Sequence, residues 1–173
     1  MFQLTFEVDG DVQLSRAFSR FAEDVKDARE PFEEVAEDFN TIMGKQFGTE
    51  GTYGSGGWAP LSKDYAEWKA KNYPGAKILE RTGLLRDSLE GANPYTIREI
   101  HPLEMTMGTK VPYAKFHQRG TKKMTQRKIV NLTEADKTRW QKIFHKWLVE
   151  QSKKEFAGLM PTIGAGKKFI GGI

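Results

Sequence analysis

The chain has 173 residues, no cysteine and a formal net charge of +4. This length fits one domain of ordinary size, and the lack of cysteine excludes disulfides, thiolate metal sites and a cysteine nucleophile. No apolar run approaches the roughly 20 residues that a membrane span requires. Residues 1–10 lack a basic region followed by an apolar block, so we expect no secretory signal and a chain that is soluble and cytoplasmic at synthesis.

The net charge hides an asymmetry between the two parts of the chain. Residues 1–50 carry 12 acidic and 5 basic side chains, whereas residues 51–173 carry 11 acidic and 22 basic ones. Such a split is typical of a nucleic-acid-binding surface or of head-to-tail contacts between identical subunits. A solvated acidic helix beside a solvated basic half explains it equally well.

The first 50 residues are expected to form one strand and one long helix. Residues 2–8 alternate between apolar and polar, which is the period of a half-buried strand. An apolar stripe then runs from Leu14 to Ile42 at alternating spacings of four and three residues, which predicts a helix. Pro31 predicts a kink or the start of a new helix, and the unbroken register favours the kink. The stripe is either a core face or, through its four phenylalanines, a contact with a neighbouring subunit.

The middle of the chain is expected to hold a loop and two short helices. Residues 48–57 contain five glycines and predict a flexible loop. Ser62 is a suitable N-cap for a helix over about residues 63–72, which Tyr73-Pro74-Gly75 ends. Thr82 is placed to cap a second short helix that ends at Gly91.

The second half predicts a hairpin followed by two further helices. Strands over 95–100 and 103–108 flank a turn at His101-Pro102. A short helix over 111–118 stops at Gly120, a further strand covers 127–132, and a last helix begins at Thr133 and fades by Gly158. Residues 158–173 have five glycines and no clear period, and they predict a flexible arm.

Together these elements predict an α+β fold. Its antiparallel sheet has about four strands, over residues 2–8, 95–100, 103–108 and 127–132. The long N-terminal helix and the C-terminal helix cover one face of this sheet. We expect one domain over residues 1–157 and an arm over 158–173.

Patterns that indicate catalysis are missing from the sequence. The three histidines, at positions 101, 117 and 145, show no spacing of four residues and no H-E-x-x-H pattern. Gly54-Ser55-Gly56 lacks the spacing of a nucleophile elbow. Gly164 to Lys168 resembles the end of a phosphate-binding loop, but Pro161 and Lys168 stand where glycine and a hydroxyl residue are required. We therefore expect no enzyme and no catalytic, cofactor-binding or metal-binding residue.

A basic stretch follows the predicted hairpin. Seven basic residues occur within 19 positions with no acidic residue between them, and Tyr113 and Phe116 interleave. Such a run is able to meet phosphates, the acidic surface of another subunit, or solvent alone. The seven residues are Lys110, Lys115, Arg119, Lys122, Lys123, Arg127 and Lys128.

Three segments of the chain carry a family resemblance. The first reads Gly57-Trp58-Ala59-Pro60-Leu61-Ser62. The second, within residues 77–88, contains Ile78-Leu79, then Thr82-Gly83-Leu84-Leu85 and Ser88. The third contains Met107-Gly108-Thr109, then Tyr113-Ala114-Lys115-Phe116-His117-Gln118-Arg119-Gly120. In order and spacing these three motif segments resemble the tailed-phage virion morphogenesis family, the Mu-type tail completion proteins. The resemblance extends from about residue 10 to about residue 150, and residues 124–127 keep the family's Met and Arg but lack its Pro.

The resemblance implies a structural virion protein of the phage neck or tail, assembled in the host cytoplasm. It implies a closed ring of identical copies beside neighbouring neck, connector and tail proteins, with no membrane and no small-molecule partner. Closed rings need unlike patches that meet, which the acidic and basic parts of the chain supply. The residues that match the family motifs are Trp58, Pro60, Leu61, Ser62, Leu79, Thr82, Gly83, Leu85, Ser88, Gly108, Tyr113, Ala114, His117, Gln118 and Gly120.

A ring at the head–tail junction has DNA passing through its centre. Lys122, Lys123, Arg127 and Lys128 would then face this DNA or a neighbouring subunit. A non-specific nucleic-acid-binding module is the alternative function, and it predicts salt-sensitive DNA binding by the isolated chain.

Overall fold

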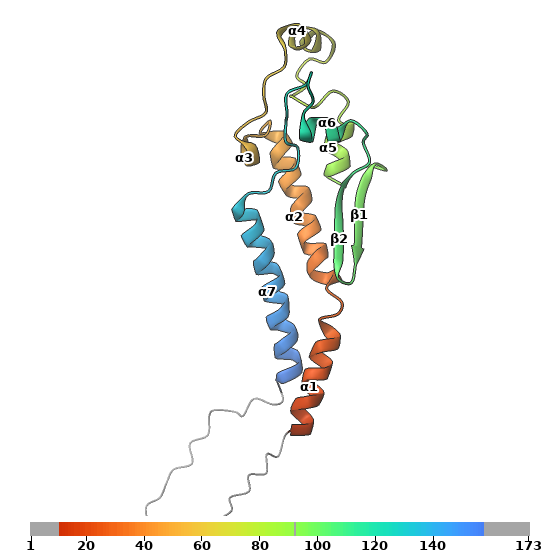
Figure 1. Cartoon of the computed structure of the whole chain (residues 1–173), viewed down its shortest axis with the longest axis vertical. Helices are drawn as coiled ribbons and strands as arrows, with labels where there is room; N and C mark the ends of the chain where they lie inside the picture. Colours follow the sequence, from red (N-terminus) through yellow and green to blue (C-terminus); the bar gives the residue numbers. More distant parts are fainter. Residues whose placement is uncertain (1–10, 92, 158–173) are drawn as a thin grey trace, which may run out of the picture. The chain divides into compact units, whose positions relative to one another are not determined.

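The computed structural model describes residues 11–91 and 93–157, which form two compact units (Figure 1). The larger one, here called the main unit, covers residues 27–144. The smaller one, here called the helix-pair unit, is described over residues 11–26 and 145–157. The strand predicted over 2–8 and the arm predicted over 158–173 lie outside the described residues. No described helix is long and apolar enough to cross a membrane.

Helix α2 (Arg29–Gly48) supplies more residues to the core cluster of the main unit than any other element, namely Phe39, Ile42, Met43 and Phe47. Pro31 lies in its first turn, where the backbone N–H that proline lacks would have no helical acceptor. Asp27 accepts a hydrogen bond from the Arg29 backbone N–H at 3.2 Å just before this turn. The apolar stripe therefore belongs to two helices, α1 (Asp11–Asp24) and α2, with a break over residues 25–28. The long N-terminal helix is present as α2, and the kink favoured at Pro31 is wrong.

The sheet of the described residues is one antiparallel hairpin. Strand β1 (Thr96–His101) pairs with β2 (Glu104–Thr109), and Ile100 stands opposite Met105. The predicted hairpin is confirmed, with both strands shifted by one residue. The hairpin lies along α2, and the Ala28 N–H donates to the Pro102 carbonyl at 2.7 Å, which joins the hairpin turn to the start of α2 (Figure 1).

The predicted four-stranded sheet is not supported, because residues 127–132 form no strand. The side chain of Gln118 replaces a neighbouring strand there. Its Oε1 accepts the N–H groups of Ile129 at 2.8 Å and Val130 at 3.0 Å, and its Nε2 donates to the Val130 carbonyl at 2.9 Å. Backbone groups that form hydrogen bonds with a side chain in this way do not need a neighbouring strand as a partner.

Short helices close the end of the main unit away from the hairpin turn (Figure 1). They are α4 (Lys63–Asn72), α5 (Leu84–Leu89) and α6 (Ala114–Arg119), and one helical turn, α3 (Thr52–Ser55), lies within the glycine-rich segment. Ser62 is at the predicted N-cap position of α4, but its side chain makes no capping hydrogen bond. Gly83, with φ +78°, precedes α5 in place of the predicted Thr82 cap. The buried core cluster consists of Phe39, Ile42, Met43, Phe47, Trp58, Leu85, Leu89, Val111 and Ile129.

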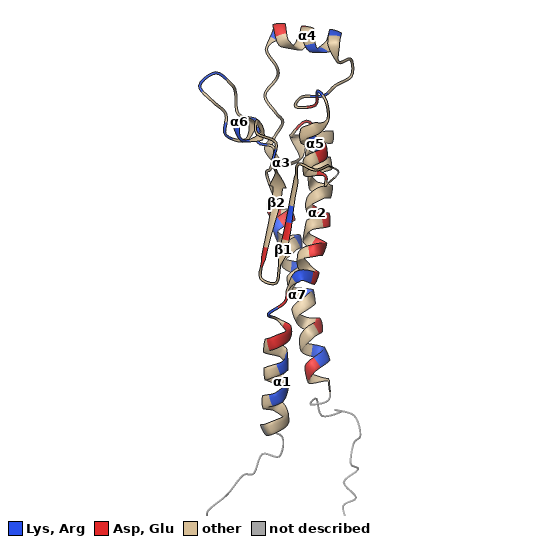
Figure 2. Ribbon diagram, turned by 90° about the vertical axis from the view of Figure 1, so that its right-hand side faces the viewer, with Lys and Arg blue, Asp and Glu red and all other residues tan. Residues whose placement is uncertain are grey.

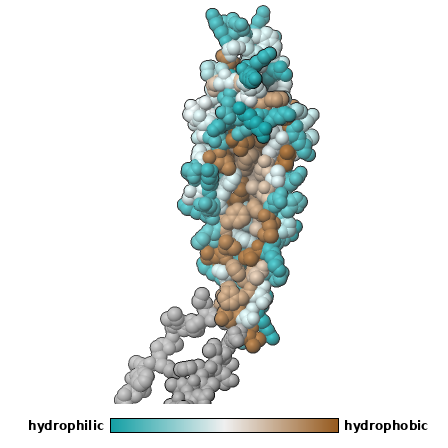
Figure 3. Space-filling model, in the orientation of Figure 1, coloured by the Kyte–Doolittle hydropathy of each residue, from teal (hydrophilic) through white to brown (hydrophobic). Residues whose placement is uncertain are grey.

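The helix-pair unit combines α1 with the last part of α7 (Glu134–Phe156). The rings of Phe18 and Phe21 lie 5.0 and 6.1 Å from that of Phe156. Ion pairs join Arg20 to Glu155 at 3.2 Å and Lys154 to Asp24 at 3.4 Å. Apolar side chains gather over α1 and the adjoining part of α7 (Figure 3).

Candidate functional site

The three motif segments meet at the end of the main unit formed by α4, α5 and α6. A cleft of about 650 Å³ lies there, and each motif segment contributes to its lining. Leu61 comes from the first segment, Leu79 and Thr82 from the second, and Tyr113 and His117 from the third. Residues separated by more than 50 positions in the sequence thus build one surface.

Trp58 links its own loop and the loop that contains Lys128 to the core. Its side chain is buried, and its ring meets that of Phe47 edge-on at 5.2 Å. The indole Nε1–H donates to the Lys128 carbonyl at 2.8 Å. Gly51 packs directly beneath the indole with φ +83°, and an added Cβ would come within 2.4 Å of it, so this close approach requires glycine.

Arg127 joins the first and third motif segments. Only 8% of the residue is exposed, and its guanidinium donates to the carbonyls of Ala59 at 2.7 Å and Pro60 at 2.8 Å. Burial lowers its pKa. These contacts engage Arg127 within its own chain, whereas Lys122, Lys123 and Lys128 of the same basic stretch are exposed. Arg127 therefore differs from the three lysines with which the sequence grouped it.

His117 lies half-buried beside the cleft. Its Nδ1 is buried and has no hydrogen-bond partner among the described residues. Burial first, and the nearby Arg127 charge second, lower the pKa of His117, which favours the neutral imidazole. The ring of Tyr113 meets the imidazole edge-on at 6.1 Å, and the His117 carbonyl accepts the Arg127 backbone N–H at 2.8 Å.

The second motif segment contributes mainly to the core. Leu85 is buried, and the buried Ser88 hydroxyl hydrogen-bonds the Leu85 carbonyl at 2.8 Å and the Thr109 hydroxyl at 2.6 Å. Leu79 has φ +62°, a left-handed conformation that is uncommon for a residue with a side chain. The remaining motif residues lie on the surface or half-buried on loops and element ends: Pro60, Ser62 and Thr82 are exposed, Gly108 lies in β2, Ala114 begins α6, and Gly120 ends it with φ +74°.

The cleft carries an excess of positive charge. Four cationic side chains line it against one acidic side chain, Glu80. Lys69 is only 4% exposed, donates its ammonium to the Lys77 carbonyl, and has a pKa lowered by burial. The four cations are Lys69, Arg81, Lys123 and Arg127. A carboxylate-bearing partner suits such a lining better than a cationic one.

The sequence did not single out Gln46, which supports this site from α2. Gln46 is fully buried, its Oε1 accepts the Gly54 N–H at 2.9 Å, and its Nε2 donates to the Lys128 carbonyl at 3.1 Å. It occupies the next position of the apolar stripe, four residues after Ile42. A polar residue at a buried position normally has a hydrogen-bond partner. The presence of a glutamine in the apolar stripe is therefore the signal that could have identified Gln46.

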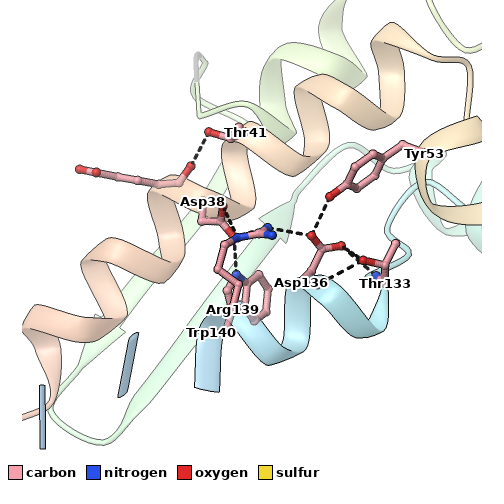
Figure 4. A network of polar contacts seen from close by, with 8 residues as sticks. Asp38, Thr41, Tyr53, Thr133, Asp136, Arg139 and Trp140 are labelled. Carbon is pink, nitrogen blue, oxygen red and sulfur yellow. Dashed lines mark hydrogen bonds and ion pairs between the residues drawn. The ribbon is translucent and has the colours of Figure 1, made fainter. Parts of the chain in front are cut away.

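A polar network around Asp136 ties the start of α7 to α2 and α3 (Figure 4). Asp136 and Thr133 exchange hydrogen bonds between side chain and backbone at 2.9 and 3.2 Å, which is a capping box. Tyr53 and Arg139 each donate to Asp136 Oδ1 at 2.7 Å. Burial alone would raise the pKa of Asp136, but these hydrogen bonds outweigh it and lower the pKa to about 2.

The same network extends to α2 through Asp38. Arg139 donates two hydrogen bonds to the Asp38 carboxylate at 2.8 and 3.0 Å, and the Trp140 indole donates one at 2.6 Å. The network is structural in character, since each of its polar groups bonds another. Among the described residues, no group of three or more His, Asp or Glu side chains could hold a metal ion. The cleft and the polar network together form a surface on a scaffold whose polar groups are held by hydrogen bonds.

Comparison with known proteins adds one finding. The sequence model described as the phage virion morphogenesis family matches residues 9–154. The chain shows no match to a curated protein or to a solved structure.

Proposed function

Because the chain belongs to the phage virion morphogenesis family, we propose that it is a structural component of the head–tail junction, acting as a tail completion or neck protein. In this proposal identical copies form a closed ring that contacts neighbouring neck, connector and tail proteins. Membership in the family gives the chain a role in virion assembly and associates it with the virion. The proposal adds that the chain acts at the head–tail junction and that its copies form a ring.

The separation of unpaired charge on the main unit supports this proposal. Glu30, Glu34 and Glu37 are exposed along one edge of α2, and the described chain offers them no ion pair. This edge is called the acidic edge below. Six exposed basic residues around α6 also have no ion pair within the described ranges: Lys110, Lys115, Arg119, Lys122, Lys123 and Lys128. Figure 2 shows acidic residues along α2 and basic residues beside α6. Two unlike patches on one chain are what a ring of identical subunits requires.

Removal of the gene from its phage tests the proposal. A junction protein is needed to join finished heads to finished tails, so the deletion is expected to accumulate both as separate particles in electron micrographs. Expression of the gene from a plasmid should restore joined particles. Joined particles at the normal frequency in the deletion would contradict a role at the junction.

Contact with DNA is a second candidate function, supported by the exposed lysines 122, 123 and 128. It predicts binding of duplex DNA that weakens steeply as salt concentration rises. Replacement of these three lysines by alanine should reduce that binding while the buried Arg127 stays in place to hold the loop. Normal head–tail joining and DNA retention in the alanine variant would argue against contact with DNA in the channel.

A further inference from the structure

The end of the main unit that carries the cleft has the composition of a protein-binding surface. Tyr65 and Trp68 on α4 are 40% and 44% exposed, and their rings stack at 5.5 Å. Tyr113 and Phe116, which flank the start of α6, are 41% and 46% exposed. Arg81 lies 5.9 Å from the centre of the Tyr73 ring. Exposed aromatic and arginine side chains around a cleft are typical of the residues that dominate binding energy in interfaces.

The charge at this end selects an acidic partner. The cleft lining holds four cations and one carboxylate, and further basic residues of α6 and its loop are exposed nearby. Figure 3 shows that hydrophilic residues dominate the surface around α4. A helix edge with acidic side chains would be complementary to this surface in charge. The helix could also pack across the exposed aromatic side chains.

The chain carries such an edge, at the opposite end of the same unit. Glu34 and Glu37 lie in the first half of α2, and the start of α2 is joined to the hairpin turn by the bond from Ala28 to Pro102. Helices α4, α5 and α6, whose residues line the cleft, lie at the other end of the unit (Figure 1). Within one copy the two surfaces therefore do not meet, and their contact requires a second copy.

We propose that the cleft end of one copy binds the acidic edge of α2 in the next copy. This inference rests on the proposed function, since it names the two surfaces that meet between identical subunits. The contact is heterologous, so each copy offers both surfaces and the chain of contacts continues until a ring closes. Because the contact joins exposed charges, added salt weakens it.

Charge reversal tests the contact. One variant carries Arg81→Glu and Lys123→Glu in the cleft, and the other carries Glu34→Lys and Glu37→Lys on the acidic edge. In each variant alone, like charges face each other between copies, so light scattering should give the mass of a monomer where the wild type is oligomeric. We expect the apparent dissociation constant to rise at least about tenfold.

Mixing the two variants is the decisive step. In the alternating order of the two variants, the reversed, negative cleft of one meets the reversed, positive edge of the other, and the normal cleft of the second meets the normal edge of the first. Both contacts then join opposite charges, so assembly should return in the mixture. A matched control carries Lys142→Glu and Glu104→Lys, both exposed and without an ion pair in the described chain, and it should assemble like the wild type. Circular dichroism checks that each variant is folded.

Three results would overturn this contact. They are a wild-type chain that stays monomeric at every concentration, a folded cleft variant that keeps the wild-type mass, and a mixture that fails to assemble. The proposed function is judged separately by the deletion phage. If both charge-reversal variants form oligomers like the wild type, this contact is contradicted but the role at the junction is not. If the deletion phage joins heads to tails normally, the role at the junction is contradicted, whatever mass the chain has in solution.

Discussion

At the residue scale, polar side chains in and near the motif segments act mainly on the backbone of other segments. Gln118, Trp58 and Arg127 together bond six backbone groups at distances of 2.7–3.0 Å. The family motifs identified these positions or their neighbours, but not their partners, because a side chain that bonds a distant loop leaves no periodic pattern. These side chains hold in place the loops that surround the cleft, and Arg127 also lines it.

Gln118 offers the clearest residue-scale prediction. Gln118→Met keeps the length of the side chain but leaves the N–H groups of Ile129 and Val130 and the Val130 carbonyl without partners. Unsatisfied buried groups are costly, so the free energy of unfolding should fall by about 2–4 kcal/mol. Urea denaturation measures this change. Gln141→Met, at an exposed position of α7, is the matched control and should change stability by less than about 0.5 kcal/mol. Equal effects of the two substitutions would contradict the role given to Gln118.

At the element scale, the network around Asp136 determines how α7 begins against α2 and α3. The pKa of Asp136 lies at about 2 in the folded chain, below its ordinary value of 3.8. The unfolded chain therefore binds the proton more readily, and the ionised carboxylate stabilises the fold above pH 4. This stability, about 2 kcal/mol, should be lost as pH falls from about 4 to about 2.

Asp136→Asn tests that prediction. The substitution should lower the free energy of unfolding at pH 7 and flatten its decline between pH 4 and pH 2, as followed by urea denaturation at each pH. Asp64→Asn, on an exposed position of α4, is the control and should keep the wild-type profile. An unchanged acid profile in the Asp136 variant would show that this carboxylate does not carry the effect.

Local patterns predicted most of the elements, and long-range contacts account for the rest. The hairpin follows from alternation and α4 from the turn residues at its two ends, which are signals that lie within a few residues. Both were found within one residue of their expected bounds. Residues 127–132 have the composition of a strand, but their partner is the side chain of Gln118, which no period of two reveals. Helix α2 begins at Arg29, with Pro31 in its first turn, and residues 25–28 are not helical. The apolar register continues through Val25 and Ala28, so it does not reveal this break between the two helices.

At the scale of the whole molecule, the division of charge along the sequence becomes a division in space. The acidic edge lies in the first half of α2, whereas α4, α5 and α6, whose residues line the cationic cleft, lie at the other end of the main unit (Figure 2). The sequence predicted the sign of the two patches, and the structure adds the cleft, its exposed aromatic rim and the separation of Arg127 from the exposed lysines. Complementary surfaces that cannot meet within one copy favour assembly between copies.

The location of the chain in the intact virion tests the central claim most directly. Electron cryomicroscopy of purified particles, with the chain identified by a fused tag, should show it as a ring at the head–tail junction. Copies within the ring should contact one another between the cleft end and the acidic edge. Density for the tag elsewhere on the particle, or mature virions that lack the chain, would contradict a structural role at the junction.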